Sequence, residues 1–275
     1  MMIDSPSSSA AASSPSSADL PAKVAIVTGA NRGIGKAIAL RLAAAGMRVV
    51  ITARDAVLLG KVAEEIRGSG GTVLELAGDL REQNLAAELV ARAVDAFGRL
   101  DVVVNNAGAT KRGLFQELSE ADWQDGFALK FFGAVRLIRA AWPHLKTSQG
   151  SVVSIAGIGG RTPGAEFTIG GSVNAALLSL TKALADQGVA DGIQVNAINP
   201  GRIKTERLIK RVGALAAERG LATAEAEREM ISAAGVTRFG EPEEIAHLVA
   251  YLVSPQGRFF QGSLIDIDGG ETKSF

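Results

Sequence analysis

Short runs of β-branched and other apolar residues recur along the chain from Lys23 onward, separated by longer stretches with helical spacing. These runs are continuously apolar rather than alternating, which is typical of strands buried on both faces of a parallel sheet. Strands are expected at residues 24–28, 49–53, 72–77, 100–105, 151–155, 193–198 and 263–267.

The segments between these strands show the three-to-four-residue apolar period of amphipathic helices. Helices are expected over residues 34–45, from the second strand to about 67, from the third strand to about 97, and over 120–145, 171–187 and 243–253. Strands that alternate with helices through right-handed crossovers form a doubly wound α/β sheet. The pattern therefore predicts a single-domain Rossmann fold with a seven-stranded parallel sheet and helices on both faces.

Two segments depart from this rhythm. Residues 1–20 are rich in Ser, Ala and Pro without apolar periodicity, which predicts a disordered tail ahead of one domain over 21–275. This tail has no Lys or Arg and no apolar run of signal-peptide length, so we expect a cytoplasmic protein. Residues 205–240 are charged and helical in pattern, and they follow the sixth strand, at the edge where such folds bind ligands. We interpret them as a substrate lid.

The composition mainly excludes certain classes of partner and of site. The chain has 275 residues with 29 Lys+Arg and 29 Asp+Glu, a balance that favours neither nucleic acid nor an anionic membrane as a partner. It has no cysteine and two histidines, so disulfides and cysteine-bound metals are excluded and no metal site is expected. No apolar stretch reaches the roughly 18 residues of a membrane span. A small-molecule substrate is the expected partner.

A glycine-rich turn, TGANRGIG, follows the first strand and opens a helix. The first glycine, Gly29, permits a tight turn, and Gly33 and Gly35 let the backbone approach a diphosphate and let the helix pack against the strand. The helix N-terminus then offers free N–H groups to the anion. A dinucleotide site is expected here.

Three motifs in this order give the chain a family resemblance. The glycine turn, the sequence NNAG at 105–108 and the sequence NPG at 199–201 resemble those of the short-chain dehydrogenase/reductase family, over about residues 22–272. The resemblance implies a nicotinamide dinucleotide and a homodimer or homotetramer. The cofactor-binding residues that it implies are Gly29, Asn31, Arg32, Gly33, Ile34 and Gly35 in the turn, Asp79 and Leu80 near the adenine, Asn106, Ala107 and Gly108 beside the adenosine, and Pro200, Gly201, Ile203 and Thr205 around the nicotinamide.

The end of the second strand indicates which dinucleotide is bound. An NAD-preferring site places Asp or Glu there, whereas this chain has Ala53 followed by Arg54, and Arg32 lies in the glycine turn. Two guanidiniums without an opposing carboxylate suit the 2′-phosphate of NADP(H). The alternative interpretation is an ion pair between Arg54 and the adjacent Asp55.

The catalytic set that the resemblance implies is missing. The family uses a Tyr and a Lys four residues apart on the helix after the fifth strand, with a Ser and an Asn nearby. Aligned on this chain, these places fall on Gly170, Asn174, Gly157 and Lys130, respectively. The only tyrosine, Tyr251, lies far from the motif. The sequence therefore predicts an atypical site.

Lys130 and Asn174 stand where the family has Asn and Lys, which suggests an exchange of the two side chains. A buried Lys whose pKa falls toward neutrality is a workable acid. Functional exchange and drift in an inactive site both stay open. The leading hypothesis is an NADP-dependent oxidoreductase that transfers hydride to or from a carbonyl, an alcohol or an activated alkene. The alternative is an inactive NADP(H)-binding pseudoenzyme that acts as a sensor or partner subunit, and a lyase or isomerase ranks third.

Two further patterns each leave two interpretations. The glycine pairs at 159–160 and 170–171 indicate either space for a bulky ligand or close packing. The start of the predicted lid is basic, which indicates either an acidic or CoA-like ligand or a solvated helix face. Its basic residues are Arg202, Lys204, Arg207, Lys210 and Arg211.

Overall fold

The computed structural model describes residues 22–273, so the predicted tail over 1–20 lies outside the described residues. Its sheet has seven strands in the order β3-β2-β1-β4-β5-β6-β7, and every neighbouring pair is parallel. The strands are β1 (Val24–Thr28), β2 (Arg48–Ala53), β3 (Val73–Ala77), β4 (Val102–Asn105), β5 (Ser151–Ile155), β6 (Gln194–Pro200) and β7 (Leu264–Ile267). The predicted doubly wound Rossmann fold is confirmed.

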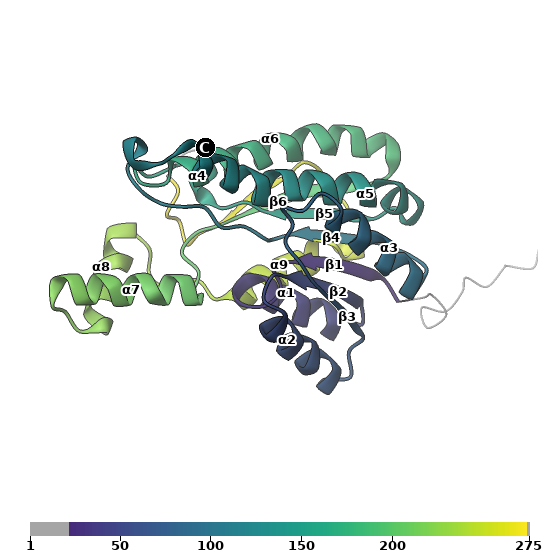
Figure 1. The fold of residues 1–275 in the computed structure, drawn as a ribbon, viewed down its shortest axis with the longest axis horizontal. Helices are drawn as coiled ribbons and strands as arrows, with labels where there is room; N and C mark the ends of the chain where they lie inside the picture. Colours follow the sequence, from purple (N-terminus) through teal and green to yellow (C-terminus); the bar gives the residue numbers. More distant parts are fainter. Residues whose placement is uncertain (1–21, 274–275) are drawn as a thin grey trace, which may run out of the picture.

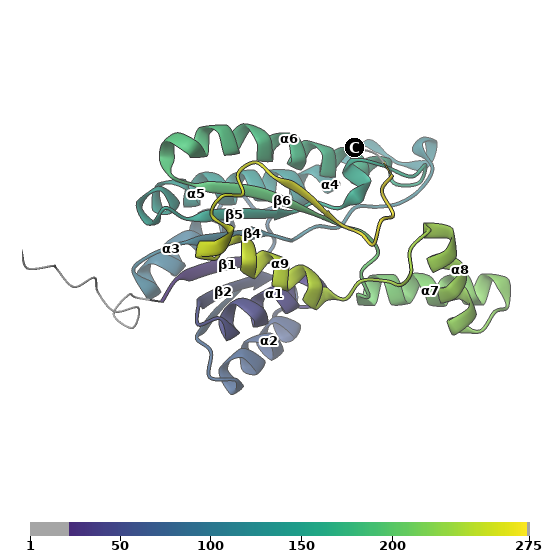
Figure 2. The ribbon, with the colours of Figure 1, turned by 180° about the vertical axis from the view of Figure 1, so that it is seen from behind.

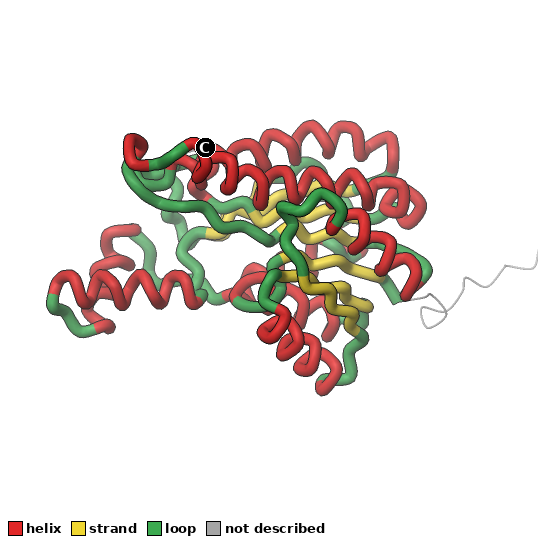
Figure 3. The backbone as a smooth tube through the Cα atoms, viewed as in Figure 1, coloured by secondary structure: helices red, strands yellow, loops and turns green. Residues whose placement is uncertain are grey.

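Helices cover both faces of the sheet (Figures 1 and 2). They are α1 (Gly33–Ala44), α2 (Ala56–Gly68), α3 (Leu85–Phe97), α4 (Glu120–Gly126), α5 (Gly133–Ser148), α6 (Thr168–Asp191), α7 (Glu206–Arg219), α8 (Thr223–Ala234) and α9 (Pro242–Leu252). Side chains of α1, α2 and α9 share one core cluster with the sheet, and those of α3 and α5 share another. Figure 3 shows the strands enclosed between these two helical layers.

The two helical layers explain why the strand sequences are continuously apolar. All five residues of β1 are buried. Val27 belongs to the cluster under α1, α2 and α9, whereas its neighbour Ile26 belongs to the cluster under α3 and α5. Because successive side chains of a strand point to opposite faces, a sheet covered on both sides needs an apolar residue at every position.

The helix expected over 120–145 is divided into three parts. Between α4 and α5 the chain forms a π-helical turn at Phe127–Phe132, which contains Lys130. A π-helical turn holds an additional residue, so it changes the direction in which the following side chains point. Such turns occur frequently at functional sites, and the apolar period of the sequence does not reveal them.

Helices α7 and α8 occupy most of the predicted lid and extend away from the body of the molecule (Figures 1 and 2). They pack against each other around a small cluster of their own. That cluster consists of Leu208, Val212, Ala216, Ala226, Met230 and Phe239. In this arrangement the two helices form an arm that joins the body after β6, rather than a cover pressed onto the sheet (Figure 1).

Candidate functional site

The glycine turn is fixed to the end of β4 by two polar side chains. The buried hydroxyl Oγ1 of Thr28 accepts hydrogen bonds from the backbone N–H groups of Asn106 and Ala107, both at 3.0 Å. The Asn106 amide Nδ2 in turn donates to the carbonyl oxygens of Thr28, at 2.9 Å, and of Gly29, at 3.2 Å. The sheet order reverses between β1 and β4, which is where Rossmann folds bind nucleotides.

The glycines of this turn leave space that no other residue would leave. Gly29 has φ of +65°, a conformation that favours glycine. A Cβ on Gly35 would lie 2.2 Å from the carbonyl oxygen of Gly29, so the first turn of α1 packs directly on the loop. The start of α1 has no side-chain cap and no acidic residue in its first turn. Its N–H groups therefore suit a diphosphate, and the residues present fit a dinucleotide.

The surroundings of Arg54 correct one expectation. Asp55 does not pair with Arg54, because its carboxylate caps α2 by accepting from the Leu58 N–H at 2.9 Å. However, the expectation that no carboxylate opposes Arg54 is also wrong, since Nη1 of Arg54 lies 3.8 Å from Oδ2 of Asp79. Asp79 is more tightly bound by Arg81, at 3.1 Å, so the exposed Arg54 guanidinium keeps most of its donors for a ligand.

Arg32 connects the glycine turn to the arm. Its Nη1 lies 3.2 Å from Oε2 of Glu206 in the first turn of α7, and both side chains are more than half exposed. Such an exposed pair contributes little to stability, so a phosphate can displace Glu206 at small cost. Thr205, the residue before α7, also approaches the turn, because a Cβ on Gly33 would lie 3.1 Å from its Cγ2.

Lys130 and Asn174 lie together, as the predicted exchange requires. The Lys130 Nζ donates to Oδ1 of Asn174 at 2.6 Å and to the carbonyl oxygen of Ala156 at 2.5 Å. The methylene groups of Lys130 cover Gly108, where a Cβ would lie 2.7 Å from the Lys130 Cδ. A side chain at residue 108 would therefore collide with Lys130, so this position suits glycine.

Burial lowers the pKa of Lys130 from its ordinary 10.5 to about 7, and the positive charge of Arg207 contributes in the same direction. No carboxylate pairs with Lys130 among the described residues, so only two hydrogen bonds to neutral oxygens, and no opposite charge, offset the cost of removing the ammonium from water. Near neutral pH both protonation states are populated, which is the property that a general acid needs.

The glycine pairs are explained by packing. A Cβ on Gly170 would lie 2.1 Å from the ring of Phe167, and one on Gly159 would lie 2.6 Å from the same ring. Gly171 likewise accommodates Pro163. Of the two interpretations of these glycines, close packing is the one observed, and an aromatic ring fills the space beside Gly170.

The remaining predicted cofactor residues divide into two groups. At the end of β6, Pro200 and Gly201 lie beside β7, with the Gly201 N–H donating to the Ile267 carbonyl at 3.1 Å, and Ile203 forms a bridge to Gly240. Leu80, by contrast, is 6% exposed and packs in the core below α3 and α5, and its carbonyl oxygen accepts a hydrogen bond from Nη2 of Arg136 at 2.6 Å, so its side chain is not available to the cofactor.

A pocket of about 420 Å³ opens beside this site. Its lining joins the loop before α4 to the start of α6 and includes Phe115, Trp123, Pro163, Ala165, Thr168 and Ser172. The rings of Phe115 and Trp123 meet edge to face, with their centroids 6.4 Å apart. Sequence reasoning missed Phe115, because nothing in its local pattern separates it from a core residue.

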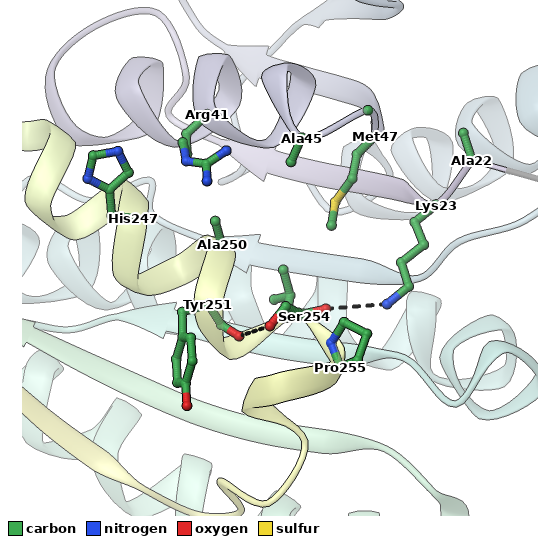
Figure 4. A pocket seen from close by; sticks show the side chains of 12 residues that line it. Ala22, Lys23, Arg41, Ala45, Met47, His247, Ala250, Tyr251, Ser254 and Pro255 are labelled. Carbon is green, nitrogen blue, oxygen red and sulfur yellow. Dashed lines mark hydrogen bonds between the residues drawn. The ribbon is translucent and has the colours of Figure 1, made fainter. Parts of the chain in front are cut away.

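A larger hollow, of about 530 Å³, lies at the opposite edge of the sheet (Figure 4). It is lined by the ends of α1 and α9, with Arg41, His247 and Tyr251 among its side chains. Arg41 lies in the last turn of α1, and the Lys23 Nζ donates to the Val253 carbonyl oxygen at the end of α9, so both cations lie at the negative end of a helix. The hollow contains none of the predicted site residues.

No group of three or more metal-ligating His, Cys, Asp or Glu side chains occurs in residues 22–273. Over the same range, the helices are too short or too polar to cross a membrane. The candidate site residues that the structure describes are the glycine turn, the arginines and the pair Lys130–Asn174.

A parallel sheet with an open glycine cradle at its switch point defines a nucleotide-binding Rossmann protein. The family model described as enoyl-(acyl carrier protein) reductase matches residues 29–272. The chain belongs to the short-chain dehydrogenase/reductase family.

Several known proteins are similar to this one over nearly the whole chain. An uncharacterised oxidoreductase of Mycobacterium tuberculosis is 38% identical over 91% of this chain and 92% of its own length. The NADPH-dependent reductase BacG of Bacillus subtilis is 32% identical over 92% of this chain and 98% of its own length. The structure of L-sorbose reductase from Gluconobacter frateurii, complexed with NADPH and L-sorbose, has a TM-score of 0.89 at 32% identity and covers 93% of this chain and 98% of that chain.

Proposed function

We propose that this protein is an NADPH-dependent reductase of carbonyl compounds. The observation that carries the proposal is the glycine turn, which Thr28 and Asn106 hold open beside the uncapped start of α1. The relatives support the choice of cofactor, because BacG is named an NADPH-dependent reductase and the sorbose reductase was crystallised with NADPH.

We match each part of the cofactor to residues of this chain. The N–H groups at the start of α1 bind the diphosphate. Arg54 and Arg32 bind the 2′-phosphate, since both guanidiniums are mostly exposed and are held only by weak surface pairs. Asp79, which lies 3.8 Å from Arg54, would contact the adenine, and the segment from Pro200 to Thr205 would border the nicotinamide.

When bound, the nicotinamide supplies the hydride. Lys130 supplies the proton that converts the developing alkoxide into an alcohol, because its near-neutral pKa keeps a transferable proton on Nζ. Two of the three ammonium protons bind Ala156 and Asn174, which leaves one for the substrate oxygen. Asn174 is 3% exposed and acts as a positioning residue that holds Nζ in place.

One observation favours the second candidate, a pseudoenzyme that binds NADP(H) without turnover. The place that aligns with the family's tyrosine is Gly170, and the ring of Phe167, which has no exchangeable proton, packs over it. In that case the Lys130–Asn174 bond is a structural link between the π-helical turn and α6.

Turnover and binding measured side by side separate the two candidates. The purified protein is titrated with NADPH by nicotinamide fluorescence and is then supplied with a panel of ketones, enones and oxo esters. A reductase oxidises NADPH with at least one class of substrate, and Lys130→Met abolishes that turnover while changing the NADPH affinity less. A pseudoenzyme binds NADPH tightly and oxidises it with none. Absence of NADPH binding would refute both.

A further inference from the structure

The basic residues at the start of the arm differ in their partners. Arg202 pairs with Glu271 at 3.0 Å, and Lys204 lies 3.6 Å from both Glu227 and Glu241. Arg207 and Arg211, in contrast, form no ion pair with any described residue. They are four residues apart on α7 and so lie on one face of the helix.

A third guanidinium faces this pair from another part of the fold. Arg112, in the loop after β4, lies over the ring of Phe167, with its Cζ 4.1 Å from the ring centroid. It too lacks an ion pair within the described range 22–273. The stacked ring fixes the plane of the guanidinium and leaves its N–H edge free to bind a planar anion.

Two of these arginines contact residues beside the proposed reaction site, Arg207 at Gly108 and Arg112 at Phe167. Nη2 of Arg207 donates to the carbonyl oxygen of Gly108 at 3.1 Å, and Gly108 is the residue that the side chain of Lys130 covers. Partial burial lowers the pKa of Arg112. The nearby carboxylate of Glu166 raises this pKa, but it is opposed by three positive charges that lower it, those of Arg211, Arg207 and Arg202. Of these, Arg211 and Arg207 carry charges that no described carboxylate neutralises at close range.

We infer that Arg112, Arg207 and Arg211 form an anion-binding site beside Lys130, and that the ketone substrate carries a carboxylate or a phosphate group. Like charges repel, so three guanidiniums held near one another are best satisfied by an anion between them.

This inference rests on the proposed reductase activity for its catalytic test, so the experiment also measures binding. Three pairs of ketones serve as probes: acetoacetate and methyl acetoacetate, levulinate and methyl levulinate, and dihydroxyacetone phosphate and dihydroxyacetone. The members of each pair share the ketone and differ in charge. Binding to the NADPH-loaded protein is followed by fluorescence of Trp123, which lines the adjacent pocket, in a Trp142→Phe background.

For at least one pair, we expect the anionic member to bind and to react at least about tenfold better than its neutral partner. Arg112→Gln should remove that preference, because one charge-assisted hydrogen bond is worth about a factor of ten. NADPH affinity should stay unchanged. The identity of the preferred anion distinguishes a carboxylate from a phosphate.

Arg228→Gln is the matched control. It removes one positive charge from the arm at an exposed position on α8, a different helix from the one that carries Arg207 and Arg211. The control should retain the preference for the anion. If Arg228→Gln and Arg112→Gln weaken anion binding equally, general surface charge explains the effect and the site is refuted.

The anion site and the reductase activity fail in different ways. If neutral ketones are reduced as well as their anionic partners, the reductase stands and the anion site is wrong. If no ketone is reduced but an oxo acid still changes the Trp123 fluorescence in an Arg112-dependent way, the anion site stands and the reductase is wrong. If no anion binds better than its neutral partner in either measurement, the inference is overturned.

Discussion

At the scale of single residues, the site depends on where a few charges are placed without partners of opposite sign. Lys130 is held by two neutral oxygen atoms rather than by a carboxylate, so burial dominates its pKa. Arg54, in contrast, is mostly exposed and lies 3.8 Å from Asp79, so its guanidinium is accessible to a phosphate. These two residues carry the most direct predictions.

The proton-donor role of Lys130 predicts a dependence of ketone reduction on pH. Below about pH 7 the ammonium is protonated and can donate, and above that value the donor is progressively lost. Values of kcat/KM for reduction should therefore fall as pH rises through 7, and alcohol oxidation should rise over the same range. Lys130→Met should remove this titration, and a variant profile that keeps it would assign the pKa to another group.

The role of Arg54 predicts a cofactor preference. Replacing Arg54 by Gln should weaken NADPH binding by about 1.5 kcal/mol, roughly tenfold, because a charge-assisted contact to the 2′-phosphate is lost. NADH lacks that phosphate, so its affinity should change little. Fluorescence titration with both cofactors measures the difference, and equal affinities of the wild type for NADPH and NADH would contradict the assignment.

At the scale of elements, α1 packs directly against the glycine turn. A Cβ at Gly35 would meet Nδ2 of Asn106 at 2.4 Å as well as the Gly29 carbonyl oxygen at 2.2 Å. Gly35→Ala should therefore separate α1 from the β4 end and reduce NADPH affinity by at least about tenfold.

Gly60 provides a matched control, because it lies inside α2 and a Cβ there meets no atom within 4 Å. Gly60→Ala should raise the free energy of unfolding by about 0.5–1 kcal/mol through helix propensity, and NADPH affinity should not change. Denaturant unfolding and fluorescence titration check both variants. A Gly35→Ala protein that binds NADPH normally would show that the contact is not needed.

Most elements could be predicted from the sequence because burial on both faces demands continuous apolar strands, and the strands at 24–28 and 151–155 match β1 and β5 residue for residue. The π-helical turn around Lys130 could not, since its additional residue shifts the helical register without any local mark in the sequence. The Arg112–Phe167 stack and the packing of Phe167 over Gly170 depend on side chains brought together by tertiary structure, which leaves no local signal.

At the scale of the whole molecule, the arm and the helical layer of α5 and α6 determine what the surface can contact. Val189 on α6 is 71% exposed, and Phe259, before β7, is completely exposed. Large apolar side chains on the surface of a Rossmann domain are covered at little cost by a second copy related by a two-fold axis.

The oligomeric state follows as a prediction. We expect a homodimer or homotetramer in which α5 and α6 pair with the same helices of a second copy. Light scattering at micromolar concentration should give a mass of at least twice the 28.4 kDa of one chain. Val189→Glu should shift the population toward smaller species, and a wild-type mass of a single chain would refute the assembly.

The central claim is that this fold binds NADPH and uses Lys130 to protonate a reduced carbonyl. The most direct test follows NADPH oxidation by wild type and Lys130→Met with the same ketone panel at pH 6.5, after both proteins have been shown to bind NADPH. The account predicts measurable turnover by wild type and a loss of about 100-fold or more in the variant, the lower end of what general acid catalysis supplies. Robust reduction that is indifferent to Lys130→Met would contradict it.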